Sequence, residues 1–278
     1  MNNISLNLIV ISLCDDKEFH KTNISVFKFI EKCNENKDFE KMFFNLIHVI
    51  SESQINRNLI SNQFKSQLDN YCCLISQDNS LYDAMNIAIG TIKEKNIFSP
   101  NHISLFLNSG SELIFSDEFI DFILNMKIDP SKSSKRSSSL FFTGANVINR
   151  DTSNIKKIWW PSEVNRFLPF KMPASHQAIF YRSNVLIHFP FLNVKGFLAS
   201  DFLQICSILN YGYKSESKKI ITVNYSNNGL SFNNPIRSIT QRFVARFIFK
   251  DGRNLTLFLL IYHLSRELVW RILFFLKR

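Results

Sequence analysis

The sequence predicts an α/β protein built on a mostly parallel sheet that is flanked by helices. Short apolar runs alternate with segments of helical spacing up to about residue 127, as in successive βαβ units. The runs are continuously apolar, which is typical of strands that are buried on both faces. Only 7 glycines and 7 prolines occur in 278 residues, which argues against an all-β protein with many tight turns.

Each element of the first half rests on a local pattern. We expect strands at 6–13, 43–50, 71–76 and 103–107, and helices at 25–33, 81–95 and 116–126. The strands are apolar runs, and the helices show apolar residues on one face. Asn79 or Ser80 is available as the cap of the second helix, and acidic residues open the third, which suits the positive end of a helix.

The second half of the chain is less regular. We expect strands at 140–148, 176–182 and 218–225, a helix at 199–213 and an irregular segment at 158–173. A loop rich in Ser and Lys, at 129–139, separates the two halves.

Cysteine usage and the N-terminal segment both indicate a cytoplasmic protein. The 5 cysteines are odd in number and show no zinc-binding spacing, so reduced, buried thiols are expected. The N-terminal segment lacks a basic region and a small-residue cleavage site. We therefore expect it to be the first strand rather than a signal peptide.

Positive charge is concentrated near the C-terminus. From Ser231 onward, nine basic residues stand against two acids, which leaves +7 of the net charge of +10. We therefore divide the chain into an α/β domain at 1–230 and a basic helical extension at 231–278.

The last part of the extension, 253–278, has charged residues on one side of a helix and apolar residues elsewhere. Charges within it disfavour a transmembrane span. The pattern predicts a helix that lies on an anionic membrane surface at the inner face of the cell membrane. The alternative is that it packs on the domain or on a second subunit of a homo-oligomer. It is too apolar for a nucleic-acid partner to be expected.

A cluster of small polar residues follows the strand at 103–107. It reads Asn-Ser-Gly-Ser-Glu and covers 108–112. These are ordinary turn residues, so a plain turn is one interpretation. Parallel sheets, however, bind ligands beyond the carboxyl ends of their strands, and this position favours a ligand site.

Several motifs in order resemble the inverting family-2 glycosyltransferases with the GT-A fold, especially bacterial enzymes of capsule and O-antigen assembly. The motifs are SQDNSLYDAMNIAIG, LFLNSGSEL, FFTGANVI, MPASHQAIFYR, GFLASDFLQICSILNYGY and NNGLSFNN, and together they span roughly residues 4–240. The resemblance implies transfer of a sugar, with inversion, from a nucleotide sugar to a lipid-linked or oligosaccharide acceptor. UDP is the expected nucleotide.

The resemblance also implies which residues bind the donor. It places Asp78 near the nucleotide, Asp83 in the donor pocket and Asn108 at the diphosphate. For Asp78 and Asp83, the alternative is that they only compensate the positive end of the following helix.

Two acidic positions of the family are replaced here. Where the family has a metal-binding Asp at the end of the strand, this chain has Ser111, followed by Glu112. Where the second strand of the family ends in a nucleotide-binding Asp, this chain has Ser51, followed by Glu52. Either the glutamates substitute, with Glu112 as the remaining ligand of Mn²⁺ or Mg²⁺, or metal binding is weak, or activity is lost.

For the acceptor side, the resemblance makes Asp201 the general base that removes a proton from the acceptor hydroxyl. It places His176 and Gln177 near the diphosphate or the acceptor. Alternatively, Asp201 is an acidic first-turn residue and His176 a structural hydrogen-bond donor. A rival function for the whole chain is that of a catalytically degenerate subunit, which acts as a binding partner in a polysaccharide assembly complex.

Overall fold

The computed structural model describes residues 4–12, 16–35, 42–51, 68–77, 80–99, 101–126, 138–149, 152, 154–164, 171–226 and 233–248. The strands within these ranges are β1 (Ile4–Ser12), β2 (Met42–Ser51), β3 (Asn70–Ser76), β4 (His102–Asn108), β5 (Glu112–Leu113), β6 (Ser138–Ile148), β7 (Ile155–Trp159), β8 (Ile179–Arg182) and β9 (Lys214–Ser226). The helices are α1 (Asp16–Glu35), α3 (Leu81–Glu94), α4 (Asp117–Asn125), α5 (Ser183–Leu186), α6 (Ser200–Asn210), α8 (Pro235–Ile248) and the 3₁₀ helix η3 (His176–Ala178).

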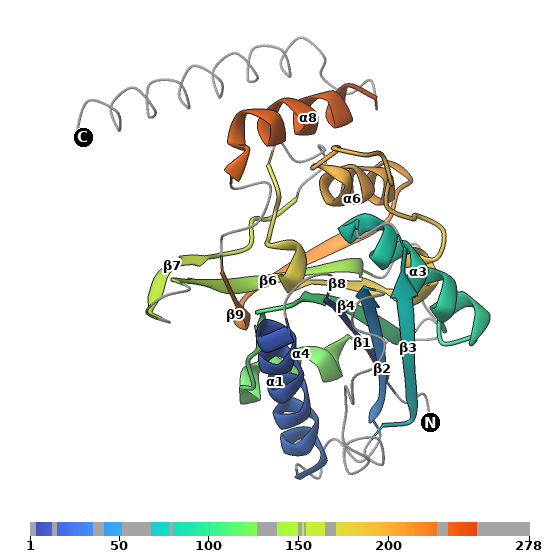
Figure 1. Ribbon diagram of the computed structural model, residues 1–278, viewed down its shortest axis with the longest axis vertical. Coiled ribbons are helices and arrows are strands. Elements are labelled where there is room, and N and C mark those ends of the chain that lie inside the picture. Colours follow the sequence, from blue (N-terminus) through green and yellow to red (C-terminus); the bar gives the residue numbers. More distant parts are fainter. Residues whose placement is uncertain are drawn as a thin grey trace.

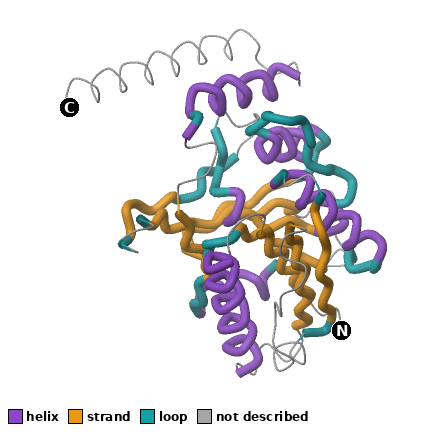
Figure 2. Tube along the Cα trace, viewed as in Figure 1, coloured by secondary structure: helices purple, strands orange, loops and turns teal. Residues whose placement is uncertain are grey.

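One sheet holds all the described strands (Figures 1 and 2). Its order is β3-β2-β1-β4-β8-β6-β9-β5, and β7 pairs with β6. The first four strands are parallel to one another, and β8 then inserts antiparallel between β4 and β6. The short strand β8 therefore brings the residues just before it, including η3, next to the carboxyl end of β4.

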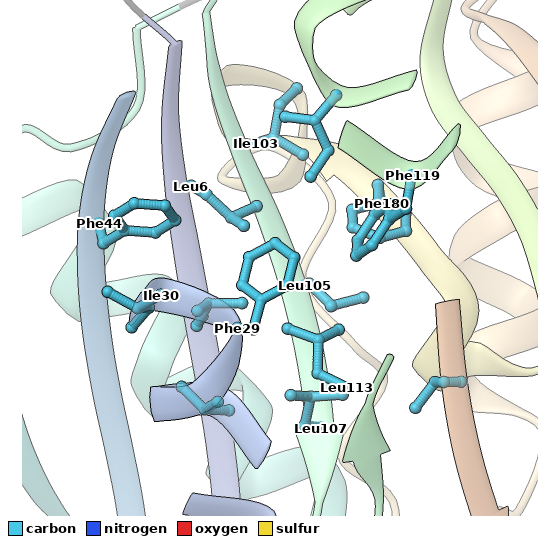
Figure 3. Packing of buried hydrophobic residues seen from close by; sticks show 14 of the residues in the cluster. Leu6, Phe29, Ile30, Phe44, Ile103, Leu105, Leu107, Leu113, Phe119 and Phe180 are labelled. Carbon is cyan, nitrogen blue, oxygen red and sulfur yellow. The ribbon is translucent and has the colours of Figure 1, made fainter. Parts of the chain in front are cut away.

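Two hydrophobic layers cover the sheet. Alternate residues of β1 point to opposite faces, so Leu6 and Leu8 join one cluster, whereas Ile9 and Ile11 join the other. Helices α1 and α4 pack on the first face, where Phe29 lies among leucines of β1 and β4 (Figure 3). Helices α3 and α6 pack on the second face.

Most of the expected elements are confirmed, and some differ in extent or type. The strand expected at 218–225 begins four residues earlier, at Lys214. The helix expected at 25–33 begins nine residues earlier, at Asp16, because polar residues in its first turns obscure the helical period. In the segment 176–182, expected to be a strand, the first three residues form η3. The segment at 158–173, expected to be irregular, includes the end of strand β7, which forms by pairing with β6 although its residues are largely exposed.

The described part of the basic extension is helix α8, which packs against α6. The stretch 253–278, for which we expect a membrane-surface helix, lies outside the described residues. Among the described residues, no helix combines the length and the apolar character that crossing a membrane requires.

A histidine is buried between α1 and the sheet. His48 of β2 packs edge-on against Phe19 and Tyr71, with ring centroids 5.0 and 5.5 Å away. The Tyr71 hydroxyl lies 3.3 Å from its Nδ1 atom. Burial lowers the pKa of His48 to about 3, since the imidazolium would lose its hydration there.

We expect His48 to destabilise the protein in acid. The unfolded chain protonates this residue near pH 6.5, whereas the folded chain binds the proton only near pH 3, so stability falls as pH drops below 6.5. Between pH 7 and pH 5 the loss is about 2 kcal/mol. Urea unfolding of the wild type and of His48→Asn at both pH values measures it. If both proteins lose equal stability, His48 is not the cause; His20→Asn, at an exposed position of α1, is the control.

Candidate functional site

The four parallel strands end together at one edge of the sheet. Ser51 at the end of β2 lies in register with Ser76 at the end of β3, and Asn108 of β4 pairs with Ile11 of β1. Small polar side chains therefore occupy neighbouring strand ends, as expected for a ligand-binding edge.

A tight turn at 108–111 follows β4 and is tied to the start of α1. Gly110 has a φ of 86°, and its N–H donates to the hydroxyl of Thr22 at 2.9 Å. A Cβ atom at this position would collide with the carboxylate of Glu18. The positive φ is what favours glycine here, because the flexible Glu18 side chain could move away from a Cβ atom.

Residues from two distant parts of the chain meet at this turn. The side-chain oxygen of Gln177 accepts hydrogen bonds from the N–H of Asn108, at 3.1 Å, and from the hydroxyl of Ser111. The Asn108 amide lies 3.0 Å from Nε2 of His176. The structure thus brings four of the predicted site residues together, although Ser111 and Gln177 are almost fully buried.

The environment of His176 favours the neutral imidazole. Burial lowers its pKa, and the nearby negative charge of Asp201 only partly opposes this effect. His176 is therefore suited to hydrogen bonding at neutral pH rather than to supplying a positive charge.

Asp201 lies at the start of α6, within electrostatic range of His176. Its Oδ1 atom accepts from the N–H of Phe202 at 2.8 Å and from the hydroxyl of Tyr82 at 3.4 Å. Burial and then the charge of Asp201 raise the pKa of Tyr82, which keeps the phenol protonated. Tyr82 is a site neighbour that the sequence did not single out.

Asp83 lies beside the end of β3 rather than with the 108–111 turn. Its carboxylate accepts from the Ser76 hydroxyl at 2.9 Å and from the Asn193 amide at 3.3 Å. Of the other predicted donor-binding residues, Ser51 is buried at the end of β2, whereas Glu52 and Asp78 lie outside the described residues.

Glu112 points toward α1. Its Oε1 atom lies 2.6 Å from Nζ of Lys21, and its other oxygen is 3.5 Å from the Asn224 amide. In the described ranges, no three His, Cys, Asp or Glu side chains come close enough to hold a metal ion. Because Ser111 carries no charge, Glu112 is the one carboxylate among the described residues at this strand end that could bind a divalent cation, and it is paired with Lys21.

Helix α8 contributes a residue that the sequence pattern did not single out. Gln241 links the helix to the loop before α6 by two hydrogen bonds. Its side chain accepts from the N–H of Leu198 at 2.6 Å and donates to the carbonyl of Gly196 at 3.0 Å. Its neighbour Arg242 is within electrostatic range of Asp201, whose charge opposes the lowering of the Arg242 pKa by burial. The sequence indicated only a basic helix, not which arginines turn inward: Arg246 is almost fully buried, and Arg242 is partly buried.

Comparison with known proteins identifies the fold. TarS from S. aureus, residues 1–349 in complex with UDP, matches with a TM-score of 0.56 and 14% identity over 95% of this chain and 71% of that chain. A longer TarS structure matches with a TM-score of 0.50 and 14% identity, over 87% of this chain and 40% of that chain. The mannosyltransferase PcManGT from Pyrobaculum calidifontis, in complex with GDP-Man and Mn²⁺, matches with a TM-score of 0.53 and 11% identity, over 89% of this chain and 64% of that chain.

The sequence itself matches no family model and no curated protein. The structural likenesses nevertheless confirm the fold class expected from the sequence. The chain has the GT-A-like α/β fold, a mostly parallel sheet flanked by helices, that it shares with TarS and with the mannosyltransferase.

Proposed function

We propose that the protein is an inverting glycosyltransferase that moves a sugar from a nucleotide sugar, with UDP as the nucleotide, to a lipid-linked or oligosaccharide acceptor. One observation carries the proposal: the strand-end turn at 108–111 is joined to His176 and Gln177, with Asp201 close by, in a GT-A-like fold. The motif resemblance supports bacterial surface polysaccharide synthesis as its setting.

In this proposal, Asp201 accepts the proton of the acceptor hydroxyl while that oxygen attacks the anomeric carbon. The bond from this carbon to the diphosphate breaks on the opposite face, so the configuration inverts and the nucleotide diphosphate leaves. The hydrogen bond from the Phe202 N–H fixes the carboxylate at the helix start. In the same proposal, neutral His176, which lies 3.0 Å from the Asn108 amide, contacts the diphosphate or the acceptor.

A screen of nucleotide sugars for binding and hydrolysis, with and without Mn²⁺ or Mg²⁺, tests the proposal. We expect at least one UDP-sugar to bind and to be hydrolysed slowly without an acceptor. Failure of every nucleotide and nucleotide sugar to bind would exclude the transferase.

The buried serines at 51 and 111 favour a second candidate, a degenerate subunit that binds but does not transfer. They cannot supply the negative charge of the acids that the family has at these positions. Nucleotide binding without turnover of any donor, in the presence of candidate acceptors, would favour this alternative.

We predict that metal dependence is weaker than in enzymes with an Asp at the strand end. Glu112 is our proposed residual ligand, but a cation would have to displace Lys21 from its carboxylate. Titration of Mn²⁺ into the apo and UDP-bound protein should therefore show weak binding that weakens further in Glu112→Gln. Tight binding that survives this substitution would show that the ligand assignment is wrong.

We also propose that the extension holds the protein at the inner face of an anionic membrane. The basis is the sequence pattern of 253–278, with its basic side and broad apolar face. Apolar burial would supply affinity, and each Lys or Arg near anionic lipid would add about 1 kcal/mol, weakened by salt.

Sedimentation with vesicles tests this proposal. The full chain should pellet with anionic vesicles at low salt, whereas a chain ending at Lys250 should stay in the supernatant and still bind UDP. If the shortened chain pellets equally well or unfolds, the segment instead packs on the domain or on a second subunit.

A further inference from the structure

A groove of about 380 Å³ lies between α1 and the chain that follows the 108–111 turn. Its floor is apolar, with Phe29 buried and Phe115 partly exposed. Its rim carries Lys21, Lys28 and Lys32 of α1. The spacings of seven and four residues place these three lysines on one face of the helix.

The groove carries an excess of positive charge. Lys21 is neutralised by Glu112, to which it is bound at 2.6 Å. The Lys32 ammonium lies 5.0 Å above the centre of the Phe115 ring. Within the described ranges, neither Lys28 nor Lys32 meets a carboxylate, and both are exposed. Two cationic side chains on an aromatic floor are thus available to a ligand.

We propose that this groove binds an anionic saccharide chain, with Lys28 and Lys32 contacting its phosphate or carboxylate groups. Lys32, which covers the Phe115 ring in the free chain, would turn to the anion and leave that ring face to a sugar. Ammonium groups act as point charges toward such anions. The negative face of an aromatic ring attracts the positively polarised C–H groups of a sugar. Lys21 and Lys32 are separated by about 16 Å along the helix, which leaves room for a short run of sugars.

The shape of the groove favours a saccharide chain over a membrane surface or a nucleic acid. A flat membrane surface meets protruding side chains, whereas this site is hollow. Single-stranded nucleic acid is bound by successive exposed aromatic residues, and here Phe29 is buried, so that Phe115 alone is partly exposed.

The groove is separate from the proposed donor site, but one end of it adjoins that site. Glu112 at its end directly follows Ser111 of the turn. A saccharide chain bound along α1 would therefore be held beside the transfer site. The choice of a saccharide rests on the proposed transferase function, whereas the site itself does not require catalysis.

Calorimetry with a heparin-derived hexasaccharide, with neutral maltohexaose as the comparison ligand, tests the proposal on the full chain. We expect the anionic hexasaccharide to bind, and Lys28→Glu/Lys32→Glu to weaken binding at least ~10-fold, because two attractive charges become repulsive. Lys93→Glu/Lys95→Glu, an equal charge change on exposed lysines at the end of α3, should have little effect. Glu112→Gln should tighten binding, since it frees Lys21.

Equal weakening in both double variants, or equal binding of the neutral sugar, would overturn the site. UDP binding is measured in parallel: UDP binding without hexasaccharide binding overturns the groove alone, and the reverse result supports the groove but overturns the transferase. Anionic phosphatidylglycerol vesicles and oligo(dT) complete the set. If Lys28→Glu/Lys32→Glu abolishes binding of the vesicles or of oligo(dT) while the hexasaccharide still binds normally, the groove binds lipid or nucleic acid instead.

Discussion

Asp201→Asn should lower turnover by at least ~100-fold, the usual contribution of a positioned general base. The amide cannot accept a proton from the acceptor hydroxyl. Its oxygen can still accept the hydrogen bond from the Phe202 N–H, so the start of α6 should be unchanged. We expect UDP to bind as in the wild type, because the substitution alters the base and leaves the 108–111 turn intact.

Steady-state kinetics with the donor found in the screen, together with UDP titration, would measure both effects. Asp117→Asn is a matched control, since Asp117 is also an acid in the first turn of a helix. Turnover close to that of the wild type in Asp201→Asn would remove Asp201 from the catalytic role. A parallel loss of UDP binding would instead assign it to donor binding or to folding.

The sequence predicted the strand ends well because their signal is local. A continuous apolar run that stops at small polar residues marks the end of a buried strand, and Asn108 lies at such an end. Helix caps were predicted less well. Ser80 is the N-cap of α3 but makes no side-chain capping hydrogen bond, whereas Ser116, whose side chain accepts from the N–H of Phe119, was not expected as a cap.

The contacts that assemble the site could not be read in the same way. Asn108 and His176 are 68 residues apart, and they meet because β8 inserts antiparallel beside β4. Tyr82 and Asp201 are 119 residues apart. The direction of Glu112 depends on the two-residue strand β5, which is too short to show a period in the sequence.

The arginine that closes the HQAIFYR motif shows how a motif residue can act through folding rather than catalysis. Arg182 is almost fully buried. Its guanidinium donates from Nη2 to the carbonyl of Met126 at 2.6 Å and from Nε to the carbonyl of Ser138 at 2.8 Å. It also lies 5.2 Å from the centre of the Phe141 ring. One side chain thus joins the end of α4 to the start of β6.

Arg182→Met should lower the free energy of unfolding by about 3 kcal/mol. Methionine can still pack its apolar stem on Phe141, but it leaves the two carbonyls without their charged donor, and each such bond is worth about 1.5–3 kcal/mol before relaxation. Arg182→Lys should be intermediate, because a single ammonium replaces the two-pronged donor. Urea unfolding midpoints at pH 7 measure the series, with Arg237→Met, at an exposed position of α8, as the control. A midpoint for Arg182→Met equal to that of the control would show that the link between α4 and β6 adds no stability.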